Sequence, residues 1–290
     1  MGSEGKRGGT MDTVLTLERS GPTATVFLDR PEKRNALGDA FFAELPAVMG
    51  ALGADPDVRV VVVAAKGPAF TVGLDLTTMA GLTAGGGPRG DSAGSAAASS
   101  AAASAARIRR QVLALQAAIS SVAACPKPVI AAVHGYCIGG GVDLISACDL
   151  RVASADAVFS VRETRMAMVA DLGTLARLPL ILPLGHVAEL AYTGKDIDAR
   201  RAEQIGLVNS VHPTQDAALA AARSLASEIA ANSPLAVEGT KAVLSEIHRG
   251  QVEAGLRYVA AWNAGHLLSD DLREAVTAFF ERRDPRFTGH

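Results

Sequence analysis

Residues 129–143 read VIAAVHGYCIGGGVD, a run of small and β-branched residues that leads into three consecutive glycines. Val129–Val133 has the length and the continuous apolar character of a strand that is buried on both faces. The glycines then predict a tight turn into a helix. In one interpretation they only allow close packing. In the other, the N–H of Gly140 points from the helix N-terminus into a pocket and can hold a developing negative charge.

Three acids follow this turn at wider intervals: Asp143, Glu163 and Asp171. Taken singly, each acid is expected to complement a helix N-terminus or to pair with a cation such as Arg162 or Arg165. Glu163 and Asp171 also stand in mostly apolar surroundings, where an acid kept for function has a raised pKa. Three acids around a candidate oxyanion donor favour proton transfer next to a carbonyl group, by way of an enolate.

A second candidate for an anion-binding amide lies upstream, in the sequence AFTVGLDL of residues 69–76. It follows Val58–Ala65, another continuous apolar run of strand length. Gly73 would free the next peptide, the N–H of Leu74, to point outward. An ordinary loop is the alternative interpretation of this stretch.

Other polar residues have plainer interpretations. Arg30, Lys33 and Arg34, in DRPEKRNAL, could bind phosphates, although a short charged stretch is usually a solvated surface. His134 is expected to be a satisfied core histidine and Cys137 a packed small hydrophobe. No cluster of His, Cys and acids has metal-ligand spacing, so no metal is expected.

Strand and helix patterns alternate through the first half of the chain, which predicts an α/β fold. Besides the two buried strands, the patterns predict strands at Val14–Glu18, Thr23–Asp29, Leu150–Ala153 and Val158–Val161, and helices at Asp39–Leu52 and Ile108–Val122. From about Thr174 the pattern becomes almost entirely helical, with helices predicted at Ala217–Ala231, Pro234–Ile247, Val252–His266 and Asp270–Glu281.

These patterns divide the chain into a strand-rich core over residues 13–205 and a helical C-terminal region over residues 206–290. Residues 1–12 are expected to form a flexible leader. The Gly/Ala/Ser-rich segment 80–106 is expected to be mobile, although its alanines could extend the helix that follows.

The composition, with 49% hydrophobic and 20% charged residues, fits a soluble globular protein. The formal charge of −2 does not point to a nucleic-acid partner, and no apolar run reaches the ~18–20 residues of a membrane span. Cys125, Cys137 and Cys148 form no CxxC pair, which favours reduced thiols. With no signal peptide or peroxisomal tripeptide apparent, we expect a cytoplasmic location.

Four stretches make the chain similar to the crotonase (enoyl-CoA hydratase/isomerase) superfamily. They are DRPEKRNAL, AFTVGLDL, PKPVIAAVHGYCIGGGVDLISACDLRVAS and TGKDIDARRAEQIGLVNSV, which begin at residues 29, 69, 126 and 193. The resemblance runs from about Val14 to Phe280. It implies a crotonase-like spiral of ββα units, with an α-helical C-terminal region that builds a homotrimer, often paired into a homohexamer.

The resemblance also implies an acyl-CoA thioester substrate, with no cofactor besides the CoA that the substrate carries. The thioester oxygen would lie in an oxyanion hole between the backbone N–H groups of Leu74 and Gly140. The substrate-binding positions that it implies are Arg30, Lys33, Arg34, Gly73, Leu74, Asp75, Leu76, Thr77 and Gly141.

Within the superfamily, the acids resemble those of the Δ3,5-Δ2,4-dienoyl-CoA isomerases, which carry Asp, Glu and Asp at the same intervals. Hydratases of the family instead have glutamate at the position of Asp143 and usually glycine at that of Asp171. SPLAVEGTK and YVAAWN, later in the chain, are also similar to the isomerases.

An isomerase of this kind removes a proton from C2 of a 3,5-dienoyl thioester and adds one at C6. These carbons are four bonds apart, so two carboxyl groups placed along the acyl chain suit the reaction better than one. Our hypothesis is that Glu163 takes the C2 proton, Asp171 delivers the C6 proton and Asp143 orients Glu163 or tunes its pKa. The opposite order stays open. The alternatives are a hydratase that needs only Glu163 and a water, and a non-catalytic acyl-CoA-binding protein.

Overall fold

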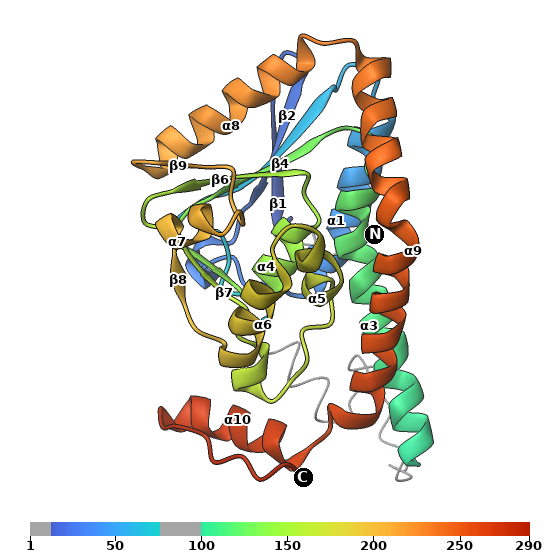
Figure 1. Cartoon of the computed structure of the whole chain (residues 1–290), viewed down its shortest axis with the longest axis vertical. Coiled ribbons are helices and arrows are strands. Elements are labelled where there is room, and N and C mark those ends of the chain that lie inside the picture. Colours follow the sequence, from blue (N-terminus) through green and yellow to red (C-terminus); the bar gives the residue numbers. More distant parts are fainter. Residues whose placement is uncertain (1–12, 76–99) are drawn as a thin grey trace, which may run out of the picture.

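The computed structural model of the chain describes residues 13–75 and 100–290 and is shown in Figure 1. Its main sheet has six strands, in spatial order β1 (Leu15–Ser20), β2 (Thr23–Leu28), β3 (Val60–Ala65), β4 (Val129–Val133), β6 (Leu150–Ser154) and β9 (Ser210–His212). β1 pairs antiparallel with β2, and the other neighbours are parallel. The α/β fold predicted from the sequence is therefore confirmed.

Both faces of the central strands are covered, which explains why β3 and β4 are apolar without alternation. Val60 and Val62 of β3 face α8 (Gln215–Ala230), whose buried residues on this face are alanines spaced four apart. Val61 and Val63 face the larger core formed with α1 (Asp39–Ala54) and α3 (Ala101–Ala124). Small side chains on α8 let the helix approach the sheet closely.

Shorter elements follow the central strands and build the edge of the molecule that holds the glycine turn. A second sheet consists of β5 (Tyr136–Ile138), β7 (Val158–Ser160) and β8 (Ile197–Asp198). The short helices are α4 (Gly140–Ser146), α5 (Thr174–Arg177), α6 (Leu184–Thr193) and α7 (Ala199–Gln204), with 3-10 turns η1 (Pro31–Lys33), η2 (Glu163–Met166) and η3 (Leu178–Leu180). The sequence prediction found β7 but missed β5, β8 and β9, because strands of two or three residues carry little periodic signal.

The C-terminal region is helical, as predicted, but it contains one long helix where two were predicted. α9 runs without interruption from Pro234 to His266 and lies along α3, and α10 (Asp270–Glu281) follows it (Figure 1). The gap between the two predicted helices, residues 248–251, contains Gly250. A glycine inside a helix costs only about 1 kcal/mol, and packing of α9 against α3 outweighs that cost.

The expected boundary at residue 205 does not coincide with the edge of the main sheet. β9 and α8 lie beyond residue 205 and still belong to the main sheet and its cover. Residues 101–106 of the Gly/Ala/Ser-rich segment are the first turns of α3, whose N-cap Ser100 accepts a hydrogen bond from Ala103 N. The rest of that segment and the leader lie outside the described residues.

Candidate active site

The glycine turn joins β5 to α4 and combines close packing with a free backbone amide. Gly139 has a φ of 52°, a backbone conformation that favours glycine. A Cβ on Gly141 would lie 2.6 Å from Thr71 Cγ2, so this glycine allows close packing. Gly140 is the first residue of α4, and its N–H has no intrahelical partner.

The amide of Leu74 lies beside that of Gly140. Leu37 bridges the loop by donating to Gly73 O (2.8 Å) and accepting from Asp75 N (2.9 Å), which turns the N–H of Leu74 away from it. The Cβ position of Gly140 is 3.8 Å from Leu74 N, and that of Gly73 is 3.6 Å from Gly140 N. Neither amide has a hydrogen-bond acceptor within residues 13–75 and 100–290. Two adjacent N–H groups are thus available to one oxygen.

Asp143 lies in the first turn of α4 and is buried. Its Oδ1 accepts a hydrogen bond from Thr174 N at 2.6 Å. Burial raises the pKa of Asp143 to about 6, against the lowering effects of Thr174 and of the nearby Arg177 guanidinium. Asp143 therefore does more than complement the dipole of α4, because it ties α4 to α5.

Glu163 begins η2 and places its carboxyl group against the glycine turn. The Cβ position of Gly139 is 3.3 Å from Glu163 Oε1, while Oε2 is buried without a hydrogen-bond partner among the described residues. Burial, and next the charge of Asp143, raise the pKa of Glu163 to about 8. Pairing with a neighbouring arginine is not observed, because Arg162 binds Asp196 and Arg165 donates to Thr193 O.

Asp171 is held by two amide side chains that the sequence analysis did not single out. Asn263 Nδ2 donates to Asp171 Oδ2 at 2.7 Å, and Gln116 Nε2 donates to the Asp171 carbonyl at 2.6 Å. Burial raises the pKa of Asp171 to about 7, although the hydrogen bond from Asn263 opposes the shift. Asn263 is the last residue of the stretch YVAAWN that resembles the isomerases, which was the signal available for it, whereas Gln116 lies in no quoted stretch.

An apolar wall lies beside these groups and suits an alkyl chain. Leu74, Met166 and Met168 pack onto a cluster contributed by α3, α9 and α10. The buried members of this cluster are Ile108, Val112, Ala260, Leu267 and Leu272. A substrate held by the two amides would therefore meet both the acids and an apolar surface.

The predicted basic residues lie apart from the acids. Arg30 is partly buried, donates to Ala36 O and lies 3.6 Å from Asp75 Oδ2. Lys33 and Arg34 are exposed. Leu76 and Thr77, two further predicted substrate-binding positions, lie outside the described residues.

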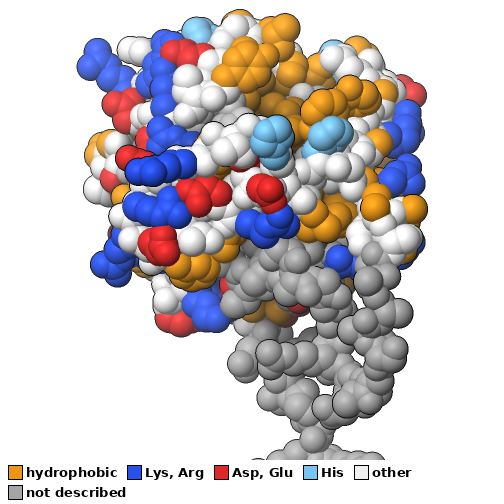
Figure 2. Space-filling view, turned by 90° about the horizontal axis from the view of Figure 1, so that it is seen from below, with side chains coloured by type: hydrophobic (Ala, Val, Ile, Leu, Met, Phe, Trp, Pro, Cys, Tyr) orange, Lys and Arg blue, Asp and Glu red, His pale blue; other side chains and the backbone are white. Residues whose placement is uncertain are grey.

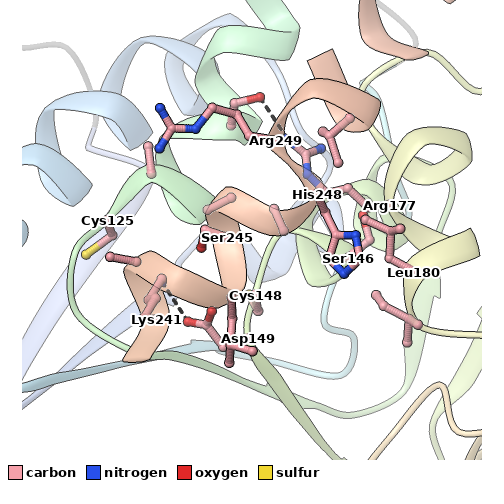
Figure 3. Close-up of a pocket in the computed structure, with 18 of the residues that line it drawn as sticks. Cys125, Ser146, Cys148, Asp149, Arg177, Leu180, Lys241, Ser245, His248 and Arg249 are labelled. Atoms are coloured by element: carbon pink, nitrogen blue, oxygen red, sulfur yellow. Dashed lines mark hydrogen bonds and ion pairs between the residues drawn. The ribbon is translucent and has the colours of Figure 1, made fainter. Parts of the chain in front are cut away.

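A separate cavity of about 720 Å³ lies between α3, α4 and α9 (Figure 3). Arg177 lines it, and Lys241 and Asp149 form an ion pair of 2.7 Å in it. None of the three acids and neither candidate amide contributes to its lining. This cavity is therefore distinct from the candidate active site.

Several plainer expectations can also be compared with the structure. His134 is buried, with Nε2 2.9 Å from Gly67 O, and Cys137 is fully buried, which confirms both interpretations. All three cysteines are free. Within the described ranges, no group of His, Cys, Asp and Glu could hold a metal ion, and no helix is long and apolar enough to cross a membrane.

Comparison with known proteins gives a consistent result. The family model described as Enoyl-CoA hydratase/isomerase matches residues 18–290. The chain is 42% identical to a protein of Arabidopsis thaliana named Delta(3,5)-Delta(2,4)-dienoyl-CoA isomerase, peroxisomal, over 96% of this chain and 99% of that protein. It is also 42% identical to one of Dictyostelium discoideum named Delta(3,5)-Delta(2,4)-dienoyl-CoA isomerase, mitochondrial, over 94% of this chain and 90% of that protein.

The names of these relatives correct the expected location. The plant relative is named as peroxisomal and the Dictyostelium relative as mitochondrial, so the cytoplasmic expectation was wrong. It rested on finding no apparent signal peptide or peroxisomal tripeptide and on expecting reduced thiols, and reduced thiols do not distinguish the cytoplasm from these organelles.

The fold is also the one expected from the resemblance to the crotonase superfamily. A crystal structure of an enoyl-CoA hydratase/isomerase from Mycobacterium paratuberculosis has a TM-score of 0.79 and 28% sequence identity, over 92% of this chain and 98% of that one. Its similarity confirms the crotonase-like architecture. With its fold, its sequence relatives and nearly its whole length in agreement, the chain belongs to the enoyl-CoA hydratase/isomerase family.

Proposed function

We propose that this enzyme converts a 3,5-dienoyl-CoA into the conjugated 2,4-dienoyl-CoA. The observation that carries the proposal is that three buried, interacting carboxyl groups have raised pKa values, and that one of them, Glu163, lies against the glycine turn beside two adjacent backbone amides. The names of the two relatives support the same reaction. Its place would be the breakdown of unsaturated fatty acids by β-oxidation.

The amides of Leu74 and Gly140 form the oxyanion hole of the proposed reaction. The thioester oxygen accepts both N–H groups, and the negative charge that reaches this oxygen in the enolate strengthens the two hydrogen bonds. Such a donor is worth about 3 kcal/mol in the transition state of other enzymes. CoA enters as part of the substrate, with Arg30, Lys33 and Arg34 near its phosphates.

Two carboxyl groups then transfer the protons. Glu163 lies against the glycine turn and thus beside C2 of a thioester held there, so its carboxylate takes the C2 proton. The electron pair of that C–H bond moves into the dienolate. Asp171 gives its proton to C6, and the double bonds move to positions 2 and 4. The enzyme finishes with the proton on Glu163, and its return to Asp171 resets the pair.

Asp143 tunes this pair. Its charge raises the pKa of Glu163 and of Asp171, which helps one proton to remain on the two groups near neutral pH. A single proton is what the reaction requires, because one group must accept while the other donates. Because Glu163 has the higher pKa, the form with this proton on Asp171 is the minor one-proton form, and it is the form that the proposed direction of transfer uses.

An ultraviolet time course of the purified protein with a 3,5-dienoyl-CoA tests the proposal. Growth of the 2,4-dienoyl band that Asp171→Asn abolishes is the expected result. No growth, together with loss of enoyl absorbance when crotonyl-CoA is supplied instead, would make the protein a hydratase and would leave Asp171 without a catalytic role.

We also propose that further copies of the chain cover the outer face of α9, as a trimer or a hexamer. Val243, Leu244 and Ile247 are each more than 60% exposed there, and Leu244 also lines the cavity of Figure 3. α10 adds exposed Phe279 and Phe280, and Figure 2 shows hydrophobic side chains gathered beside charged ones at that end. Sedimentation should give three or six times the 29.7 kDa of one chain, and less after Leu244→Asp.

A further inference from the structure

Asn263 connects the C-terminal helix α9 to the proposed proton donor. It is 2% exposed, and its Nδ2 donates to Asp171 Oδ2 at 2.7 Å and to Val169 O at 3.0 Å. No other side chain of the described residues donates to the Asp171 carboxyl group. The environment of that carboxyl group therefore depends on a helix that lies 92 positions away in the sequence.

The two acceptors fix the orientation of the Asn263 amide. An asparagine side chain has two N–H donors on one nitrogen, and here each hydrogen has its own oxygen. Turning the amide over would place its oxygen against the Val169 carbonyl and the Asp171 carboxylate and would lose both hydrogen bonds. Asn263 thus holds Asp171 Oδ2 in place and leaves Oδ1 to carry the proton.

We infer that Asn263 is a positioning residue of the isomerisation, which aligns the Asp171 carboxyl group and stabilises the carboxylate that remains after its proton has been delivered. This inference rests on the proposed function, because it assigns Asp171 to proton delivery at C6. A donor to the carboxylate favours the ionised form and so makes Asp171 a stronger acid.

Gln116 offers a matched comparison. Its Nε2 also donates twice, to the Asp171 carbonyl at 2.6 Å and to Leu256 O on α9 at 3.0 Å. Both amides therefore tie the Asp171 segment to α9, but only Asn263 contacts the carboxyl group. Loss of Gln116 should affect stability and placement of the segment without moving the protonation of Asp171.

The test compares Asn263→Leu with Gln116→Met, two variants of similar shape that lack the amide donors. We expect Asn263→Leu to lower kcat about tenfold or more and to move the acid limb of the pH profile up by about one unit, since loss of the donor raises the pKa of Asp171. KM should change little. Gln116→Met should lower the melting temperature and leave the acid limb in place.

The outcomes distinguish failure of the role of Asn263 from failure of the proposed function. An unmoved acid limb in Asn263→Leu, with an active parent enzyme, would overturn the role of Asn263 and leave the proposed function intact. No 2,4-dienoyl band from the parent enzyme at any pH would overturn both. If Asn263→Leu does not fold, Asn263→Asp replaces it; this variant keeps the size and should move the limb further upward, because it also adds an acid.

Discussion

The two halves of the candidate active site are built in different ways. The amide half, formed by Leu74 and Gly140, consists of backbone that two glycines with positive φ turn into place, Gly73 at 91° and Gly139 at 52°. The carboxyl half consists of side chains whose protonation depends on neighbours from α5, α9 and α4. Local backbone conformation determines the first half, and tertiary contacts determine the second.

The difference explains why the three acids are not equivalent. Asp143 accepts an N–H of Thr174 and has a pKa of about 6, and Asp171 accepts an N–H of Asn263 and has a pKa of about 7. Glu163 Oε2 has no donor among the described residues, and the pKa of Glu163 is about 8. Burial is the largest cause of all three raised pKa values; the charge of Asp143 adds to the shifts of Glu163 and Asp171, and the hydrogen bonds from Thr174 and Asn263 oppose those of Asp143 and Asp171.

Removing the proton acceptor should give the largest effect in the carboxyl half. Glu163→Gln is expected to lower kcat by about 10³-fold with little change in KM, because the proposed acceptor of the C2 proton is lost. Its melting temperature should not fall, since the raised pKa shows that the folded site disfavours ionised Glu163. Glu246→Gln, on the exposed face of α9, is the control. Activity within tenfold of the parent would contradict the assignment.

A substitution that shifts the backbone of the amide half should give the next largest fall in kcat. Gly73→Ala places a Cβ 2.8 Å from Ile138 O at a φ that alanine rarely adopts, so the N–H of Leu74 must move. We expect a fall in kcat of about 10²-fold, as for the loss of one oxyanion donor. The same change at Gly50, which has open space in α1, should leave kcat unchanged. Equal effects of the two changes would remove the distinction between the halves.

The pH profile should depend on the carboxyl half alone. In the proposed mechanism, activity requires one proton on the pair of Glu163 and Asp171, whose pKa values are about 8 and 7. Below pH 7 both groups are protonated and no base remains; above pH 8 both are ionised and no acid remains. kcat/KM should therefore be bell-shaped and fall about tenfold at pH 6 and at pH 9. A profile that is flat across this range would refute the shared proton.

The smallest effect is expected at Asp143. Asp143→Asn removes a negative charge that raises the pKa of both Glu163 and Asp171, so both limbs of the profile should move to lower pH. The hydrogen bond from Thr174 can persist, because the asparagine oxygen also accepts. Activity should fall several-fold at pH 8.5 and hardly at pH 6.5. Limbs that stay in place would show that Asp143 acts only as a structural link.

The sequence predicted the amide half more completely than the carboxyl half. Glycines before a helix and after a buried strand indicate free amides by themselves, and Gly140 and Leu74 do lie side by side. The three acids were also found. Their partners were not, because Asn263 and Gln116 reach Asp171 across 92 and 55 positions, and no local pattern encodes such contacts.

The same limit applies to the fold. The buried strands β3 and β4 were predicted because a continuous apolar run is a strong signal. α9 was predicted in two pieces, because its packing against α3 joins residues far apart in the sequence and leaves no local signal. Elements whose structure is decided by a few neighbouring residues, such as β3 and β4, were therefore predictable from the sequence.

Because Asn263 lies near the end of the chain, the hydrogen bond to Asp171 can form only late in synthesis. A growing chain leaves the ribosome N-terminus first, at roughly 5–20 residues per second. The sheet, both amides and all three acids emerge before Asn263. Until α9 has been synthesised and has docked, Asp171 lacks its donor. A nascent or proteolytically shortened chain that ends before residue 263 would thus hold every acid of the reaction and remain a poor catalyst.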